Sequence, residues 1–173
     1  MRLIKVCSYQ ENTILNTMFF LDNCTHNSID CVSKYLQIMK EILTALMIWL
    51  GANTPFDTNH DIPNVLFLSQ TQMEEMFYKG ESKMPNTLHG LYDTESDTII
   101  LPDTWDRRKA WDLGVLLHEM VHYLQDQNNM DFNCTAEMEK EAWPIQQRYL
   151  KERHDYAWDY DGLWYAVIST CNY

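Results

Sequence analysis

Residues 117–125 read LHEMVHYLQ and are the most informative stretch of the chain. They fall within a segment of helical periodicity from about Asp112 to Gln127, where we predict an amphipathic helix. His118 and His122 are four residues apart, so both project from one side of this helix, about one turn from each other. We therefore expect the two imidazoles to lie close enough to bind one metal ion.

The segments on either side of this helix predict a small sheet and further helices. Apolar residues recur at the helical period over residues 28–50, and Gly51 follows as a natural stop. Residues 64–69 have the length of a strand, 71–78 are helical, and 88–92 and 98–101 form two strands around a polar turn. A last helix is predicted over about 135–151, kinked at Pro144.

This order of elements predicts an α+β fold in a single domain over residues 1–173. Residues 1–27 form an irregular lead-in, and residues 28–127 hold the long first helix, the sheet and the histidine helix. Residues 128–173 hold the last helix, which is rich in glutamate, and an aromatic tail.

His118-Glu119-x-x-His122 is an HExxH motif, the pattern of zinc hydrolases. Catalytic zinc takes three protein ligands and a water molecule, whose pKa it lowers to about 7. Glu119 is placed to accept the proton of that water as a general base. We therefore predict one Zn²⁺ and the hydrolysis of peptide bonds. Two alternatives stay open: a zinc hydrolase of a non-protein amide or a cell-wall peptide, and a non-catalytic zinc-containing binding module.

The third zinc ligand is expected in the following helix. An HExxHxxGxxH pattern is absent, but Glu137, Glu139 and Glu141 follow. Positions two apart on a helix diverge by about 200°, so at most one or two of these carboxylates can face the metal. With Trp143 and Leu150 on the buried side, Glu139 is the preferred ligand and Glu141 the alternative.

The motif followed by Glu139-Lys140-Glu141-Ala142 resembles the gluzincin metallopeptidases, and the longer stretch is similar to small single-domain bacterial HExxH proteins. The resemblance implies a minimal zincin-like domain with His118, His122 and Glu139 as ligands. It also implies that the strand before the histidine helix is a sheet edge that binds an extended substrate, here Thr98, Ile99, Ile100 and Leu101. Trp143 stands where many gluzincins have an aspartate that orients a ligand histidine.

An enzyme of this kind also needs a donor for the oxyanion of its tetrahedral intermediate. The candidates are Tyr149, Tyr156, Tyr160 and His154. The aromatic tail over residues 156–165 is expected to pack on the core, or else to line the cleft and accept apolar side chains.

Charge and composition narrow the range of partners. Lys and Arg number 13 against 25 Asp and Glu, a net charge of −12, which argues against a nucleic-acid partner and favours basic peptide or protein substrates. The longest apolar run, residues 42–50, is shorter than the roughly 20 residues of a membrane span, so no span is predicted. The sequence does not indicate an oligomeric state.

The five cysteines are an odd number without CxxC spacing. This count, and the lack of a convincing signal peptide, favour reduced thiols and a cytoplasmic location. A secreted or periplasmic protein with a Cys134–Cys171 disulfide is the alternative.

Overall fold

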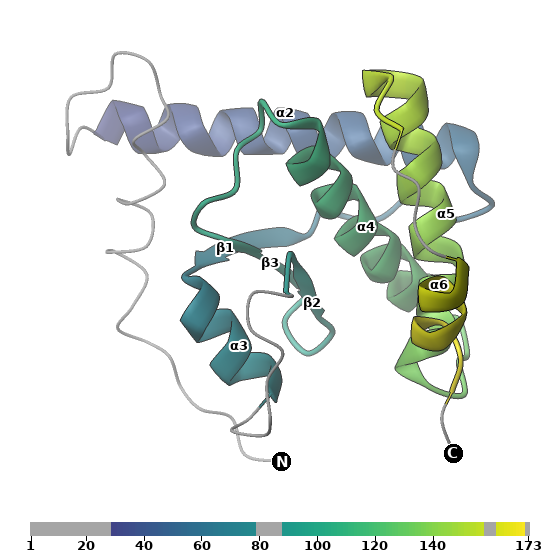
Figure 1. The fold of residues 1–173 in the computed structure, drawn as a ribbon. Coiled ribbons are helices and arrows are strands. Elements are labelled where there is room, and N and C mark those ends of the chain that lie inside the picture. The colour runs from purple at the N-terminus through teal and green to yellow at the C-terminus, as the bar shows by residue number, and fades with distance from the viewer. Residues whose placement is uncertain (1–28, 79–87, 158–161, 172–173) are drawn as a thin grey trace.

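The computed structural model describes residues 29–78, 88–157 and 162–171 and shows an α+β fold (Figure 1). In chain order the elements are α2 (Ile29–Asn53), β1 (Asn64–Leu68), α3 (Gln70–Tyr78), β2 (Leu91–Asp93), β3 (Thr98–Pro102), α4 (Ala110–Gln127), α5 (Thr135–His154) and α6 (Gly162–Ile168). The predicted α+β class is confirmed, and α5 runs through Pro144 as one helix. The lead-in at residues 1–27 lies outside the described residues.

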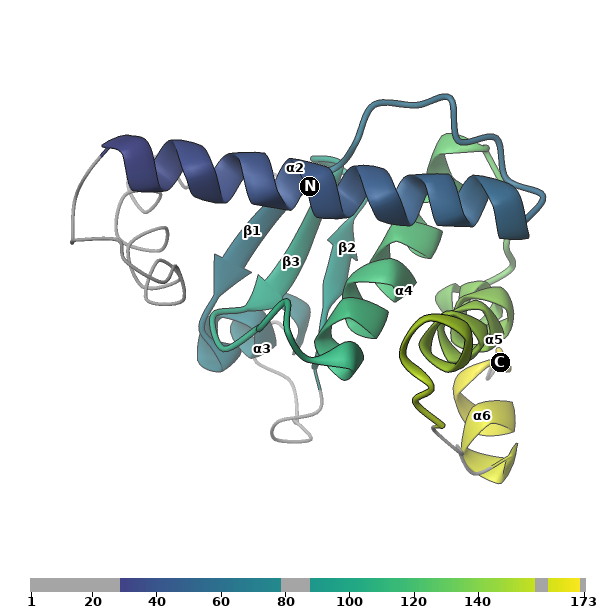
Figure 2. The same cartoon turned by 90° about the horizontal axis from the view of Figure 1, so that it is seen from above.

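The sheet has three strands in the order β1-β3-β2. β1 pairs with β3 in parallel and β2 pairs with it antiparallel, so that Leu66 and Leu91 both lie opposite Ile100. The prediction that residues 98–101 form an edge strand is therefore wrong. The three middle side chains of β3 are buried, as expected for a short apolar run in the centre of a sheet. The edge strand beside α4 is β2 (Figure 2).

Helices cover the sheet and extend the core to one side of it. α2 crosses one side of the sheet and α3 lies on the other (Figures 1 and 2). Seen from above, β1, β3, β2, α4 and α5 follow one another across the molecule (Figure 2). Tyr35 of α2 meets Phe67 of β1 with ring centroids 6.0 Å apart, and Trp49 of α2 meets Tyr149 of α5 at 5.2 Å. The long helix thus packs against both ends of this row of elements.

Part of α2 is also apolar enough to cross a membrane. By length and composition alone, Val32–Asn53 qualifies, with a mean hydropathy of 1.2 in its most apolar window and 33% of that window buried inside the protein. This stretch is longer than the run at residues 42–50 on which the sequence expectation rested. Core helices of soluble proteins and signal sequences pass the same test, so the absence of a membrane span stays a prediction.

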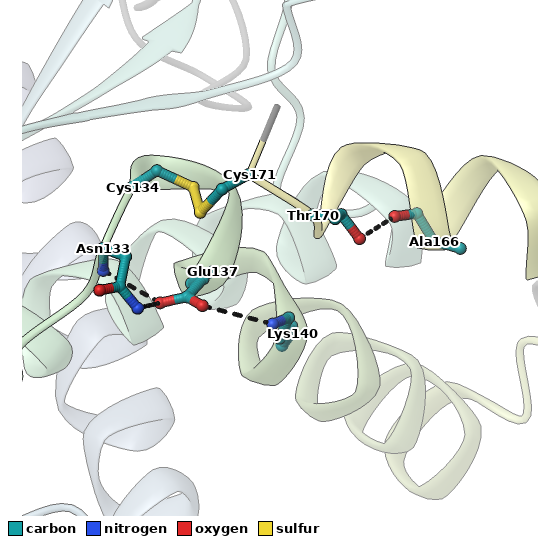
Figure 3. The surroundings of a disulfide bond; sticks show 7 residues. All are labelled: Asn133, Cys134, Glu137, Lys140, Ala166, Thr170 and Cys171. Atoms are coloured by element: carbon teal, nitrogen blue, oxygen red, sulfur yellow. Dashed lines mark hydrogen bonds and ion pairs between the residues drawn. A yellow bond between two sulfur atoms is a disulfide. The ribbon is translucent and has the colours of Figure 1, made fainter. Parts of the chain in front are cut away.

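A disulfide joins Cys134, the residue just before α5, to Cys171 beyond α6 (Figure 3). The expectation that all the cysteines are reduced is therefore wrong, and the alternative pairing is the one formed. Disulfides persist mainly in oxidising compartments, and the cytoplasmic location and its secreted or periplasmic alternative both stay predictions. Beside the bond, Glu137 accepts hydrogen bonds from the backbone and side chain of Asn133 and pairs with Lys140 at 3.6 Å (Figure 3).

Candidate metal centre

α4 carries both histidines and lies between β2 and α5. Every residue of α4 from Gly114 to Gln125 is buried, polar ones included. Side chains on a helix that is so largely buried have little contact with water, so its polar groups need partners within the protein. The burial of His118, Glu119 and His122 therefore marks a polar cluster inside the protein.

α5 brings Glu139 to this cluster. The Nε2 atoms of His118 and His122 lie 3.1 Å apart, and the Glu139 carboxylate lies 3.1 Å from the first and 3.3 Å from the second. The ligand atoms of these three residues all lie within 4.8 Å of one another, the only such group found among the described residues. Two imidazole nitrogens and one carboxylate are a ligand set that suits zinc.

The tautomer of each histidine follows from its second nitrogen. His118 Nδ1 lies 3.1 Å from Gln146 Oε1, and His122 Nδ1 lies 2.9 Å from Gln125 Oε1. An amide oxygen only accepts, so both Nδ1 atoms carry the proton and both Nε2 lone pairs face Glu139. Three electron-rich groups then converge, and Glu139 Oε2 is buried without a hydrogen bond from the described residues. A bound cation would resolve this arrangement, so the residues fit a metal ion.

The pKa shifts of His122 and Glu139 also indicate that the cluster favours positive charge. Burial alone would lower the pKa of His122, but Glu139, which accepts a hydrogen bond from the protonated ring, and the charges of Glu119 and Glu139 raise it to about 9. Burial alone would raise the pKa of Glu139, but interactions with His118 and His122 in their protonated forms outweigh it and hold that pKa well below its usual range. The centre therefore draws positive charge, either protons or a metal ion.

Glu119 lies beside the cluster and faces a cleft. Burial raises the pKa of its carboxyl group, and the neighbouring His118 and His122 offset this only in part. A Cβ atom added to Gly90 would lie 2.7 Å from Glu119 Oε1 and 2.9 Å from Val115 Cγ1. Glycine at this position therefore lets the backbone leading into β2 pass directly over the predicted general base.

The cleft itself has a volume of about 630 Å³ and lies between β2, α4 and α5. All four motif and ligand residues line it, and so do His89, Gly90, Leu91 and Tyr92 from the β2 side. Much of the remaining lining is apolar: Phe77, Leu88, Trp111, Val115, Met138 and Trp143. Clefts of this size and character are typical binding sites for small molecules or peptide side chains.

The predicted oxyanion donors lie elsewhere. Tyr149 packs against Trp49, and its hydroxyl lies 3.4 Å from His154 Nε2. Neither of these residues nor Tyr156 is among the cleft residues, and Tyr160 lies outside the described residues. Ten residues of helix separate Tyr149 from Glu139, about 15 Å, which explains why its side chain does not reach the metal centre. Among the described polar residues on the β2 side of the cleft, His89 and Thr94 are exposed.

Other predicted residues also find their places. Glu141 accepts a hydrogen bond from Gln125 Nε2 at 3.2 Å and is not part of the ligand group. Thr98, Ile99, Ile100 and Leu101 do not line the cleft. In the aromatic tail, Tyr165 donates a hydrogen bond to the carbonyl of Lys140, which connects α6 to α5.

Sequence reasoning missed Gln125 and Gln146, which hold the two histidines. A glutamine three residues after His122 lies on the same face of the helix, and this spacing was the available signal. Gln146 comes from α5, and no local pattern connects it with His118.

Comparison of the chain with known proteins identifies the family to which it belongs. No curated protein and no solved structure matches the chain. One family model, described as "Domain of unknown function (DUF6647)", matches residues 36–172. The match includes the whole sheet, both helices of the candidate metal centre and the two bridged cysteines. The chain therefore belongs to the DUF6647 family.

Proposed function

We propose that this protein is a zinc-dependent metallopeptidase that hydrolyses peptide bonds. The observation that carries the proposal is the convergence of His118 Nε2, His122 Nε2 and the Glu139 carboxylate in one apolar cleft, with Glu119 beside them. These three residues would hold one Zn²⁺, in the ligand arrangement of the gluzincins that the sequence resembles. When bound, the ion supplies Lewis acidity and a nucleophilic water at neutral pH.

Glu119 serves as the general base in this proposal. Its carboxyl group is buried, and burial raises its pKa, a direction that suits a group that takes up a proton and returns it. It accepts the proton of the attacking water and passes it to the leaving amine. Its position against Gly90 limits its freedom, so the carboxylate is held ready for this transfer.

The free edge of β2 takes the role that the sequence had suggested for residues 98–101. Among the described strands β2 pairs with β3 alone, and Leu91 and Tyr92 line the cleft. An extended peptide added along this edge would lie across the metal centre and would form backbone hydrogen bonds irrespective of its sequence. With this change, the arrangement of β2, α4 and α5 fits a minimal zincin-like domain.

The cleft favours substrates with a bulky apolar side chain next to the scissile bond. Trp111 and Trp143 are among its lining residues, and no Lys or Arg of the described part of the chain lines it. The preference for basic substrates, expected from the charge of −12, would then act through the wider surface. Both preferences are compatible with one peptide that carries apolar and basic residues at different positions.

Metal analysis combined with peptide hydrolysis tests the proposal. We expect one zinc per chain in the wild type and in Glu119→Gln, and loss of zinc in His118→Ala. Only the wild type should hydrolyse a peptide library at an appreciable rate, because Glu119→Gln keeps the ligands but removes the base. Glu152→Gln, an exposed site on α5, is the matched control and should behave as the wild type.

Three results separate the alternatives. Absence of stoichiometric zinc would overturn the proposal altogether. Zinc with equal turnover in Glu119→Gln and the wild type would refute the role of the base. Zinc binding with no peptide hydrolysis, but with release of product from small amides or cell-wall peptides, would shift the function to the non-protein hydrolase.

A further inference from the structure

We propose that Gln125 is a positioning residue of the metal centre. Its hydrogen bonds hold His122 in place relative to α5, next to Glu139, and its amide group also donates to Glu141. The inference rests on the proposed zinc site, but it concerns residues that do not touch the ion. It also gives Glu141, the alternative ligand, a different role.

Gln125 is fully buried, yet its amide is satisfied at both ends. Its Oε1 accepts from His122 Nδ1 at 2.9 Å, while its Nε2 donates to the carbonyl of Met138 at 3.0 Å and to Glu141 Oε2 at 3.2 Å. Burying an amide without partners costs several kcal/mol in an apolar medium. These contacts fix the orientation of the amide, because only its NH₂ group can donate to the two oxygens on α5.

The position of these contacts links the two helices that supply the ligands. His122 lies on α4, whereas Met138 immediately precedes Glu139 on α5. One side chain therefore holds the imidazole of His122 in the tautomer that presents Nε2, and also holds the backbone next to the third ligand. A loss of this link would loosen the distance between His122 Nε2 and the Glu139 carboxylate, now 3.3 Å.

Glu141 adds charge to the far end of this chain of hydrogen bonds. A carboxylate that accepts from the amide NH₂ polarises the amide and makes its oxygen a stronger acceptor. The bond from His122 Nδ1 is then strengthened, which makes Nε2 a better donor to a metal. Through the neutral Gln125 amide, Glu141 would thus strengthen the metal-binding nitrogen of His122, as a carboxylate bonded directly to the histidine does in other metal sites.

Gln146 provides an internal comparison. It accepts from His118 Nδ1 at 3.1 Å, but its own Nε2 has no hydrogen-bond partner among the described residues. Gln146 therefore orients one histidine, and Gln125 both orients a histidine and couples the helices. Comparing the two positions therefore separates the effect of orienting a histidine from the effect of connecting α4 with α5.

The test measures zinc affinity by competition with a chelator, together with the visible absorption spectrum of the Co²⁺-loaded protein. Gln125→Met should weaken zinc binding about 10–100-fold and alter the Co²⁺ spectrum, because outer hydrogen bonds typically contribute this much to metal affinity. Glu141→Gln should weaken it less, since an acceptor oxygen remains. Gln37→Met, at an exposed position on α2, is the control and should leave both readouts unchanged.

A charge exchange distinguishes positioning from simple packing. Gln125→Glu brings a carboxylate against Glu141 and should weaken zinc binding more than Gln125→Met. Adding Glu141→Gln should recover part of the affinity, because the amide now at position 141 can donate to the carboxylate at position 125. Circular dichroism and thermal unfolding of each metal-free variant show whether it is folded.

The outcomes for this inference and for the zinc site itself differ. If the wild type bound no zinc, the proposed function would fail and this inference with it. If the wild type bound zinc and a folded Gln125→Met bound it equally tightly, only the inference would be overturned. It would also be overturned if Glu141→Ala abolished zinc binding while Glu139→Ala did not, since Glu141 would then be a ligand.

Discussion

Replacing Gly90 by alanine should disturb the predicted general base without removing a metal ligand. The new Cβ atom would lie 2.7 Å from Glu119 Oε1, 2.8 Å from Glu119 Cγ and 2.9 Å from Val115 Cγ1. Carbon atoms in ordinary contact lie about 3.5–4.0 Å apart, so either the Glu119 side chain or the backbone before β2 must move by several tenths of an ångström. Both Glu119 and Val115 are buried, which leaves them little room.

The size of the effect follows from the crowding. An extra methyl group in a packed site costs about 1–3 kcal/mol of unfolding free energy. For a domain of this size that corresponds to a fall in Tm of about 2–12 °C. A displaced catalytic group can slow turnover by about 10²-fold, while the zinc content should stay at one per chain because the ligands are untouched.

The assay combines thermal unfolding, metal analysis and hydrolysis of the best library peptide. Gly51→Ala is the matched control, because its Cβ atom would lie 2.7 Å from Thr58 Oγ1, away from the cleft, and turnover should not change. Gly162→Ala, which meets nothing within 4 Å, should alter neither quantity. Wild-type Tm and turnover in Gly90→Ala would refute the close contact, and a lower Tm with unchanged turnover would show that Glu119 does not move.

Three further predictions concern the disulfide, pH and substrates. Cys171→Ser removes the disulfide, whose cysteines are 37 residues apart in the sequence, and should lower the unfolding free energy by up to about 4 kcal/mol. Denaturant titration measures this loss, which should equal the loss that reduction causes in the wild type. In the metal-free protein the pKa of His122 is raised from 6.5 to about 9, so its contribution to stability is complete below pH 6.5 and is lost as pH rises through 9. Thermal unfolding in the presence of a chelator should show this loss. Added zinc should stabilise the protein more at pH 9 than at pH 6.5, because protons no longer compete with the metal for His122 Nε2. Peptides with Phe or Leu at the scissile bond should be cleaved faster than those with Asp, and basic flanking residues should help at low salt only; equal rates for acidic and basic peptides at low salt would contradict the charge effect.

The pattern of the sequence was sufficient for the local part of the site. His118, Glu119 and His122 share one stretch of helix, and their relative positions depend only on the helical repeat. The same reasoning located α2, α3, α4 and α5 along the chain, because apolar periodicity is a local property. It also reduced the predicted third ligand to Glu139 or Glu141.

The sheet was harder to predict than the helices. An apolar strand of five residues reads the same whether it lies at the centre or at the edge of a sheet. Its neighbours are chosen by long-range pairing: β1, about 30 residues earlier, lies on one side of β3, and β2 lies on the other. The proposed substrate-binding edge is therefore β2 and not residues 98–101.

The sequence by itself determined that two histidines and a glutamate lie together on one helix, because 3.6 residues per turn leave them no other arrangement. Only the tertiary structure decided which α5 residues meet that helix. The rotation of α5 about its own axis brings Glu139 to the imidazoles and turns Glu141 towards Gln125, and the packing of α5 on α4 places Gln146 at His118. The Cys134–Cys171 bond depends in the same way on the return of the chain through α6, since a disulfide forms only where the fold brings two Cα atoms within about 7 Å.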